Sequence, residues 1–242
     1  MNTTEIIETG LTPAQQELSD LWDEHVRDEF ATKDARATLD TMVLDAYVNH
    51  VPVLTGGVGR EQLREFYSKH FIPNMPADTE IVPSSRTIGS ERLVDEMIIR
   101  FTHDIEIDWM LPGIAPTGKH VEGATVAVIT FPDGRIFNEH IYWDQASGLV
   151  QLGLLDPATL PVAGVETARK VIDPTLPSNR LMAADWQNFD GDADYLNPFQ
   201  RHPNGATGSG FLAGSHAGSP CGVWDARGHP ITSERKREGR HS

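Results

Sequence analysis

The first third of the chain places apolar residues at helical spacing. Between residues 13 and 30 they recur at every fourth position, which predicts an amphipathic helix. These residues are Leu18, Trp22, Val26 and Phe30. Thr12 and Pro13 stand before them as an N-cap and a first helical residue. The same spacing predicts a second helix through 39–47 and a third through 63–71, so three helices are expected before any strand.

After residue 78 the pattern changes to segments rich in β-branched and aromatic residues, separated by turn signals. The predicted strands are 79–89, 91–111, 118–131, 134–144 and 149–155. The turn Pro132-Asp133-Gly134 predicts that the segments on either side of it form a hairpin. A short helix is expected over Val165 to Val171. Helices followed by a meander of strands indicate an α+β domain.

The strand around Leu93 to Trp109 has two unlike faces. Alternate residues form a mostly apolar set, namely Leu93, Asp95, Met97, Ile99, Phe101, His103, Ile105, Ile107 and Trp109. Because side chains alternate along a strand, this set is expected to face the core, with Asp95 and His103 as polar residues inside it. A single bulge would reverse the later part and exchange His103 for Asp104.

The segment FNEHIYWD alternates in the same way. One face carries Phe137, Glu139, Ile141 and Trp143, and the other carries Asn138, His140, Tyr142 and Asp144. Glu139 is then the lone acid on an apolar face, where a carboxylate is costly unless it is paired, hydrogen-bonded or protonated. Such an acid near a histidine suits general acid–base catalysis, and a buried structural pair is the alternative interpretation.

Composition divides the chain unevenly. It has 242 residues, 39% of them hydrophobic, which is enough for a sizeable core. Residues 183–242 are rich in Gly, Ser, Pro, Asp and His without a sustained period, and we interpret them as a flexible low-complexity tail. Residues 1–11 are expected to form an N-terminal arm, and residues 12–182 the folded domain.

Charge and cysteine content exclude several kinds of partner. A formal net charge of −15 argues against a nucleic-acid surface, and the basic run SERKREGRH lies in the predicted tail, as a solvated terminus or a docking signal. No apolar run approaches the ~20 residues of a membrane span, and the first residues lack the features of a signal peptide. The single cysteine, Cys221, cannot form an internal disulfide. These observations predict a cytoplasmic protein.

Two segments carry a resemblance to a known family. PGIAPTGKHVEG (112–123) and DGRIFNEHIYWDQASGLVQLGLLDP (133–157), after the predicted helices, resemble the SnoaL-like polyketide cyclase and ester cyclase group of the nuclear-transport-factor-like α+β cone superfamily. The resemblance covers about residues 13–173. It implies a curved mixed or antiparallel sheet wrapped around the N-terminal helices to form a conical pocket. It also implies no metal or organic cofactor, and a homodimer.

The resemblance nominates site residues one by one. The EHxxWD motif points to Glu139, His140 and Asp144, and the end of the second predicted helix offers His50. His103 and Asp108 fall on the strand where related enzymes place a catalytic acid or histidine. The candidates for lining the pocket are Tyr47, Phe101, Trp109 and Trp143. Each has a structural alternative: His50 as a helix-end dipole partner, His140 with Asp144 as a surface pair, and the tryptophans as core.

The proposed chemistry is cofactor-free general acid–base catalysis in an apolar pocket. Glu139 or His103 would remove a proton from a small hydrophobic carbonyl or lactone-like substrate, or activate water against it. His140, His50 or Asp144 would supply the complementary proton. Cyclisation, isomerisation, dehydration and ester or lactone hydrolysis all fit, whereas the Arg-x-Asp spelling of limonene-type epoxide hydrolases is absent. The alternative is a non-catalytic dimeric domain that binds a hydrophobic ligand or a partner protein.

Overall fold

A computed structural model describes residues 10–182 of the chain, and the predicted tail with Cys221 lies outside these residues. The helices are α1 (Pro13–Phe30), α2 (Ala35–Asp40), α3 (Gly59–Glu65), the π-helical η1 (Phe66–Phe71), α4 (Gln145–Gln151) and α5 (Glu166–Ile172). The strands are β1 (Met42–His50), β2 (Thr55–Val58), β3 (Glu80–Ile88), β4 (Arg92–Thr102), β5 (His120–Thr130) and β6 (Ile136–Trp143). The expected α+β class is confirmed.

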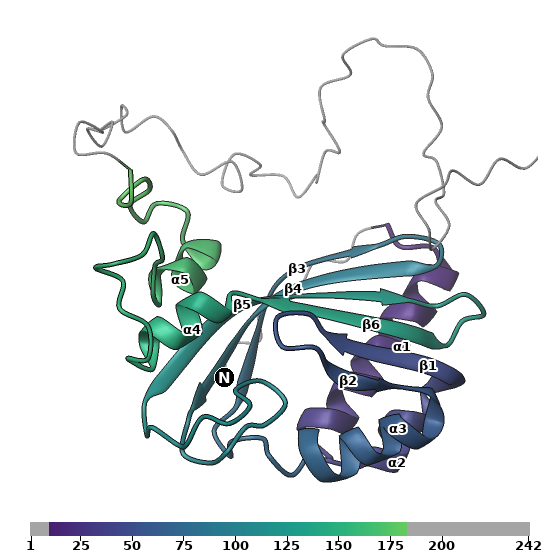
Figure 1. The fold of residues 1–242 in the computed structure, drawn as a ribbon. Helices are drawn as coiled ribbons and strands as arrows, with labels where there is room; N and C mark the ends of the chain where they lie inside the picture. The colour runs from purple at the N-terminus through teal and green to yellow at the C-terminus, as the bar shows by residue number, and fades with distance from the viewer. Residues whose placement is uncertain (1–9, 183–242) are drawn as a thin grey trace, which may run out of the picture. The chain divides into compact units, whose positions relative to one another are not determined.

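One six-stranded sheet organises the domain, in the order β2-β1-β6-β5-β4-β3. Only β1 and β6 run parallel, and every other neighbouring pair is antiparallel, so the sheet is mixed. Figure 1 shows the sheet twisted and curved, with α1, α2 and α3 gathered beside β1 and β2, and with α4 and α5 next to β5. The hairpin predicted at 132–134 is confirmed, because it joins the antiparallel strands β5 and β6.

The first predicted helix is confirmed together with its start. In α1 the Thr12 hydroxyl accepts a hydrogen bond from the Gln15 backbone N–H at 3.3 Å, and the Gln15 side chain accepts one from the Thr12 backbone at 2.9 Å. This reciprocal pair satisfies two backbone donors that a helix start otherwise leaves free. The buried residues of α1 include Trp22, His25 and Glu29, so its inward face carries ionisable groups as well as apolar ones.

The second predicted helix is wrong. A six-residue helix, α2, ends at Asp40, and residues 42–50 form the strand β1 between β2 and β6. Met42 and Ala46 fit a helical period, but Ala46, Val48 and His50 are buried at alternate positions. The pairing with two neighbouring strands therefore overrides the helical spacing. The expectation that three helices precede any strand fails for the same reason.

Two further segments differ from their prediction. Residues 149–155 were expected to form a strand, but α4 begins at Gln145 because Asp144 caps it by accepting from the Ser147 backbone N–H at 3.0 Å. Strand β4 ends at Thr102, so the predicted extension to 111 is wrong. There the His103 carbonyl accepts from the Thr117 and Gly118 N–H groups, and the chain leaves the sheet.

The inward set of the long strand is confirmed. Leu93, Met97, Ile99 and Phe101 are buried, and the pairing of β4 with β5 runs without a register shift. Asp95 is satisfied inside this set, because it accepts from the Trp22 indole N–H at 2.9 Å and from two Arg86 nitrogens. The lone acid thus ties α1 and β3 to the sheet instead of facing a ligand.

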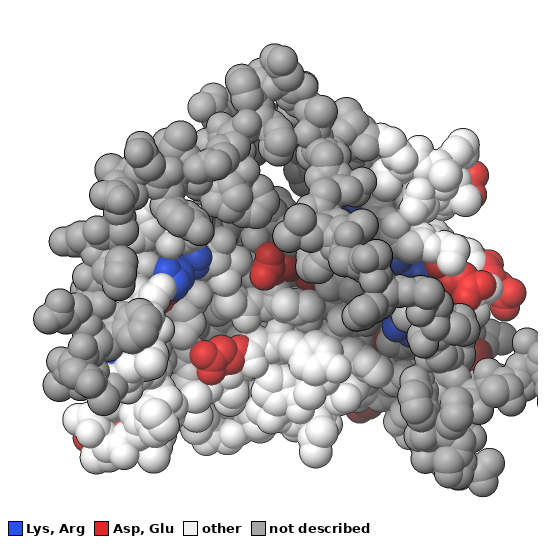
Figure 2. All heavy atoms as spheres, turned by 90° about the horizontal axis from the view of Figure 1, so that it is seen from above, with Lys and Arg blue, Asp and Glu red and all other residues white. Residues whose placement is uncertain are grey.

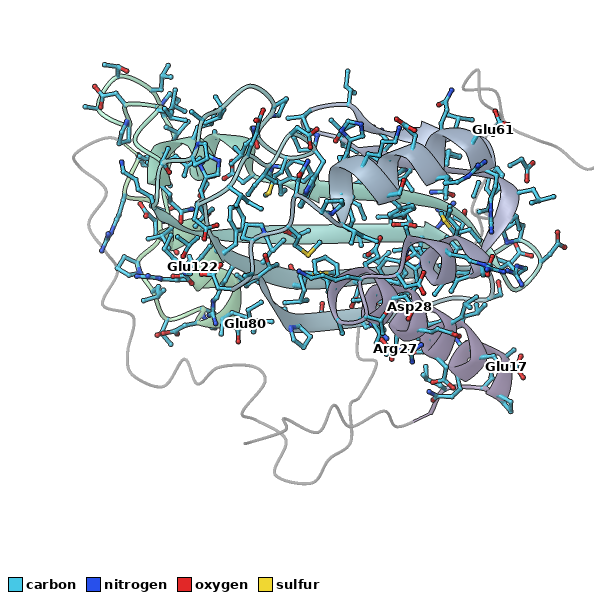
Figure 3. All side chains as sticks on the ribbon, turned by 90° about the horizontal axis from the view of Figure 1, so that it is seen from below. Glu17, Arg27, Asp28, Glu61, Glu80 and Glu122 are labelled. Carbon is cyan, nitrogen blue, oxygen red and sulfur yellow. The ribbon has the colours of Figure 1, made fainter. Side chains whose placement is uncertain are left out.

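Ion pairs hold α5 against the other face of the sheet. Glu122 of β5 is buried and accepts from Arg169 of α5 at 2.7 Å and from Arg100 of β4 at 3.3 Å. Arg100 also donates to Glu80 at 3.3 Å, and Figure 3 shows Glu80 and Glu122 near one another. These two guanidinium groups lower the pKa of the Glu122 carboxyl against the opposing effect of burial.

On the face visible in Figure 2, basic and acidic side chains of residues 10–182 lie interspersed among uncharged ones. None of the helices in that part of the chain has the length and apolar character needed to cross a membrane.

Gly56 in β2 is expected to be irreplaceable. Its φ is +135°, and a Cβ there would lie 2.0 Å from the Val48 carbonyl oxygen of β1. The variant Gly56→Ala is therefore expected to lower the free energy of unfolding by about 3 kcal/mol, as measured by urea denaturation. Gly148→Ala in α4 is the control, since its Cβ meets nothing within 4 Å and is expected to stabilise the helix slightly. Equal stability of the two variants would contradict this account.

Candidate active site

A cavity of about 60 Å³, partly open to solvent, lies between the inward face of the sheet, helix α1 and η1. Its polar lining residues are Glu29, His50, Tyr67, Thr125 and Glu139. The aromatic residues that line it are Trp22, Phe30, Phe66, Tyr67, Phe71, Trp109 and Trp143. The cavity is thus apolar with a few polar groups that converge on it.

A buried ionic cluster forms one wall of the cavity. His25 Nε2 lies 3.2 Å from Glu29 Oε1 and 3.1 Å from Glu139 Oε1. The Tyr67 hydroxyl donates to the same Glu139 oxygen at 3.1 Å. Helix α1, η1 and strand β6 each supply a member, so only the folded sheet brings them together. The i,i+4 spacing of His25 and Glu29 places both on one face of α1.

The tautomer of His25 follows from its neighbours. The Thr41 hydroxyl donates its only proton to the Thr38 carbonyl at 2.6 Å, so it must accept from His25 Nδ1, which lies 2.6 Å away. Nε2 faces two carboxylates, and a proton on it makes the ring an imidazolium. Burial alone lowers the pKa of His25, but the charges of Glu139 and Glu29 outweigh burial and raise it to about 10.

The second histidine of the cavity, His50, is held in the opposite state. The Thr55 hydroxyl donates to the Trp109 carbonyl at 2.6 Å, so it accepts from His50 Nδ1 at 3.1 Å. Nε2 is left as a lone pair without a hydrogen-bond partner among residues 10–182. Burial lowers the pKa of His50 to about 4, although the Glu139 charge opposes this effect. His50 is therefore a neutral base at physiological pH.

The remaining ionisable groups of the cavity complete a polarised site. Burial raises the pKa of Tyr67 well above its usual value, and the Glu139 and Glu29 charges add to the effect, so Tyr67 stays a hydrogen-bond donor. Burial raises the pKa of Glu29, while His25 works in the opposite direction. Acid–base sites commonly hold neighbouring ionisable groups whose environments shift their pKa values in opposite directions, and structural ion pairs produce such shifts as well.

The cluster has a spacing that a metal ion could also use. The ligand atoms of His25, Glu29 and Glu139 lie within 4.8 Å of one another. The proton on His25 Nε2 links the same three groups at hydrogen-bonding distance. We therefore treat the trio as an ion-pair cluster.

Four of the residues nominated from the sequence line the cavity. Glu139 and His50 are each 3% exposed and occupy the inward face of β6 and β1, in register such that Glu139 pairs with Val48 and His50 with Ile141. Trp109 and Trp143 pack around His50 with ring centroids 5.3 Å and 5.6 Å from the imidazole. The structure brings these four together.

The other nominated residues lie elsewhere. His140 accepts from or donates to the Tyr47 hydroxyl at 3.1 Å, and both belong to the face of the sheet opposite the cavity. Asp144 caps α4. Phe101 is buried in the core beside the cavity and does not line it. The proton-transfer roles considered for His140 and Asp144 therefore find no geometric support.

His103 is fully buried and does not line the cavity. Its Nδ1 lies 3.3 Å from the Thr117 hydroxyl, and its Nε2 has no partner in the described part of the chain. Burial lowers the pKa of His103. Asp108, the other residue nominated on this segment, pairs with His70 at 2.6 Å in the chain beyond β4.

Sequence reasoning missed His25, Glu29 and Tyr67 as partners of Glu139. A signal was present, because Leu18, Trp22, His25 and Glu29 follow the 4-3-4 spacing of one helix face. The prediction followed the apolar set that continues from Trp22 through Val26 and Phe30, and the set that continues through His25 and Glu29 on the same helix was not considered. No local signal connects either set to a strand more than a hundred residues away.

No family model matches the sequence, and the search of curated proteins gives no match. Similar solved structures include a SnoaL-like protein from Jannaschia sp. CCS1, which is 16% identical, covers 61% of this chain and 99% of its own, and has a TM-score of 0.48. TsrD from Streptomyces laurentii is 16% identical; the match covers 60% of this chain and 100% of TsrD, with a TM-score of 0.48.

The epoxide hydrolase/cyclase-like enzyme SalBIII is 17% identical, with 53% of this chain and 92% of its own covered and a TM-score of 0.42. Solved structures of the kind that the sequence resemblance indicates are thus among the similar proteins. At these identities and TM-scores, the fold assignment rests on the sheet and helices described above.

Proposed function

We propose that this protein is a cofactor-independent enzyme that performs general acid–base chemistry on a small molecule held in the cavity. The observation that carries the proposal is that one aromatic cavity is lined both by His50, a neutral histidine of fixed tautomer, and by the buried carboxylate of Glu139. The two side chains come from adjacent parallel strands and share the inward face.

His50 is assigned as the base because its Nε2 lone pair is free. It would remove a proton from a carbon next to a carbonyl, or from a water that attacks a carbonyl, and become an imidazolium. The Glu139 charge stabilises that imidazolium, since it already acts to raise the pKa of His50. A protonated His50 with a pKa of about 4 is more acidic than an ordinary imidazolium, so it returns the proton to the product more readily.

Tyr67 and His25 support this chemistry indirectly. Both contact Oε1 of Glu139 and hold the carboxylate in place, and its second oxygen accepts no hydrogen bond from residues 10–182. They are positioning residues in this proposal. The apolar lining fits a small hydrophobic carbonyl or lactone-like substrate, and isomerisation, cyclisation, dehydration and hydrolysis all require the same proton transfer.

The test is product detection by mass spectrometry. Purified protein and its Glu139→Gln variant are incubated with panels of lactones, esters and poly-β-ketone mimics. We expect a product with the wild type and little with the variant, whose amide keeps the shape of the side chain and removes its charge. Retention of a hydrophobic ligand by both proteins, with no turnover of any compound, would support a binding domain instead.

A further inference from the structure

The cavity that is proposed to hold the substrate has more acidic than basic groups in its lining. Its lining includes two carboxylates, Glu29 and Glu139, and among the described residues no lysine or arginine lines it. His50 and Tyr67 are neutral for the reasons given above. The one neighbouring cation is His25, which lies behind the carboxylates and contacts both. One imidazolium thus faces two carboxyl groups, and burial raises the pKa of the Glu29 carboxyl.

Aromatic rings surround this charge. Seven aromatic side chains line the cavity, and His50 packs among Phe71, Trp109 and Trp143 with ring centroids 5.3 to 5.8 Å from its own. The faces of such rings carry negative potential, and they attract a desolvated cation by about 2 kcal/mol or more. An anionic ligand would be repelled by this lining, because the ring faces and the carboxyl groups both present negative potential.

From this lining we infer that the cavity binds the positively charged ammonium group of a small ligand, either a protonated amine or a quaternary ammonium. The inference rests on the proposed function in that the same cavity holds the substrate. Glu29 and the aromatic faces would balance the ligand's charge, while His25 balances Glu139. The unpartnered Nε2 of His50, on a side chain 3% exposed, offers an acceptor for a donor group elsewhere on the ligand.

Glu29 is the specificity residue in this inference. Glu139 Oε1 receives hydrogen bonds from Tyr67 and His25, and Glu29 Oε1 lies 3.2 Å from His25 Nε2. Glu29 also lines the cavity. Burial raises the pKa of Glu29, so an ammonium group in the cavity would stabilise the charged form of its carboxyl, whereas an amide in its place keeps the shape and loses that interaction.

Isothermal titration calorimetry with two probes of nearly the same shape tests the inference. Choline carries a quaternary ammonium, and 3,3-dimethylbutan-1-ol replaces its nitrogen by carbon. EDTA is present throughout, so that no metal ion occupies the cluster. We expect choline to bind the wild type at least about tenfold more tightly than the neutral alcohol, which corresponds to about 1.4 kcal/mol.

Two matched variants of α1 complete the design. Glu29→Gln is expected to lose the preference for choline, and Glu17→Gln is expected to retain it, because Glu17 is exposed on the same helix (Figure 3). Circular dichroism establishes that both variants are folded. Equal or tighter binding of the alcohol would overturn the inference, as would the absence of saturable choline binding or an unchanged preference in Glu29→Gln.

These results separate the inference from the proposed function. Turnover of neutral substrates by a protein that does not bind choline overturns the cation site and leaves acid–base catalysis standing. Tight choline binding that depends on Glu29, without turnover of any compound, supports the cation site and removes the catalytic proposal.

Discussion

His50→Asn is expected to lower kcat/KM by roughly 100- to 10,000-fold on any substrate that the protein turns over. The Asn amide can still donate to the Thr55 hydroxyl in place of His50 Nδ1, so the local hydrogen bonds of β1 are kept. It has no counterpart of Nε2, which is the proposed base. Steady-state kinetics with each variant measures the effect.

The control for this substitution is His140→Asn, the same chemical change on the opposite face of the sheet. Its expected kcat/KM is close to that of the wild type, because His140 contacts Tyr47 and not the cavity. If His50→Asn were folded and fully active, or if His140→Asn lost as much activity, the assignment of the base to His50 would be wrong.

The dependence of kcat/KM on pH also tests the assignment of His50 as the base. His50 acts as a base only when it is deprotonated, so kcat/KM should hold as pH falls below 6.5 and decline near pH 4, where the folded protein takes up the proton. In Glu139→Gln the residual activity should decline at a still lower pH, since the Glu139 charge that favours protonated His50 is gone. An acidic limb at the ordinary histidine pKa of 6.5 would contradict burial of the base.

His25→Gln is expected to have the largest effect on stability, a loss of about 3–5 kcal/mol in the free energy of unfolding. The wild-type imidazolium is fully buried and is the cation that Glu29 and Glu139 share. Its removal leaves two carboxylates together in an apolar wall, or forces one of them to take up a proton. Urea denaturation near neutral pH measures the loss.

The pH dependence of this loss has a definite sign. The pKa of His25 is raised from 6.5 to about 10 by folding, so its contribution is complete below pH 6.5 and disappears as pH rises through about 10. The stability difference between wild type and variant should therefore shrink in alkaline solution. Adding Glu29→Gln to His25→Gln should recover part of the lost stability, because one uncompensated charge is removed. A difference that grows with pH would show that His25 is neutral in the fold.

The sequence was sufficient where local rules decide structure. The capping residues of α1, the hairpin at 132–134 and the alternation in β4 and β6 each depend on neighbours close in the chain. They placed Glu139 and Trp143 on an inward face. They failed at 42–50, where an apolar spacing that fits a helix is overridden by pairing with β2 and β6. They failed again at the strand predicted over 149–155, where the helix α4 that Asp144 caps overrides a strand-like composition.

The candidate site itself was decided by the tertiary structure. The sequence determined that Glu139 would be an acid on an apolar face and that His50 was available, but not that parallel pairing of β1 with β6 puts both in one cavity. Packing of α1 under the sheet adds His25 and Glu29, and η1 adds Tyr67. Protonation states followed only then, because burial and facing charges depend on contacts between residues far apart in the chain. Periodicity assigns a side chain to a face, and only the packing of elements determines which other charges share it.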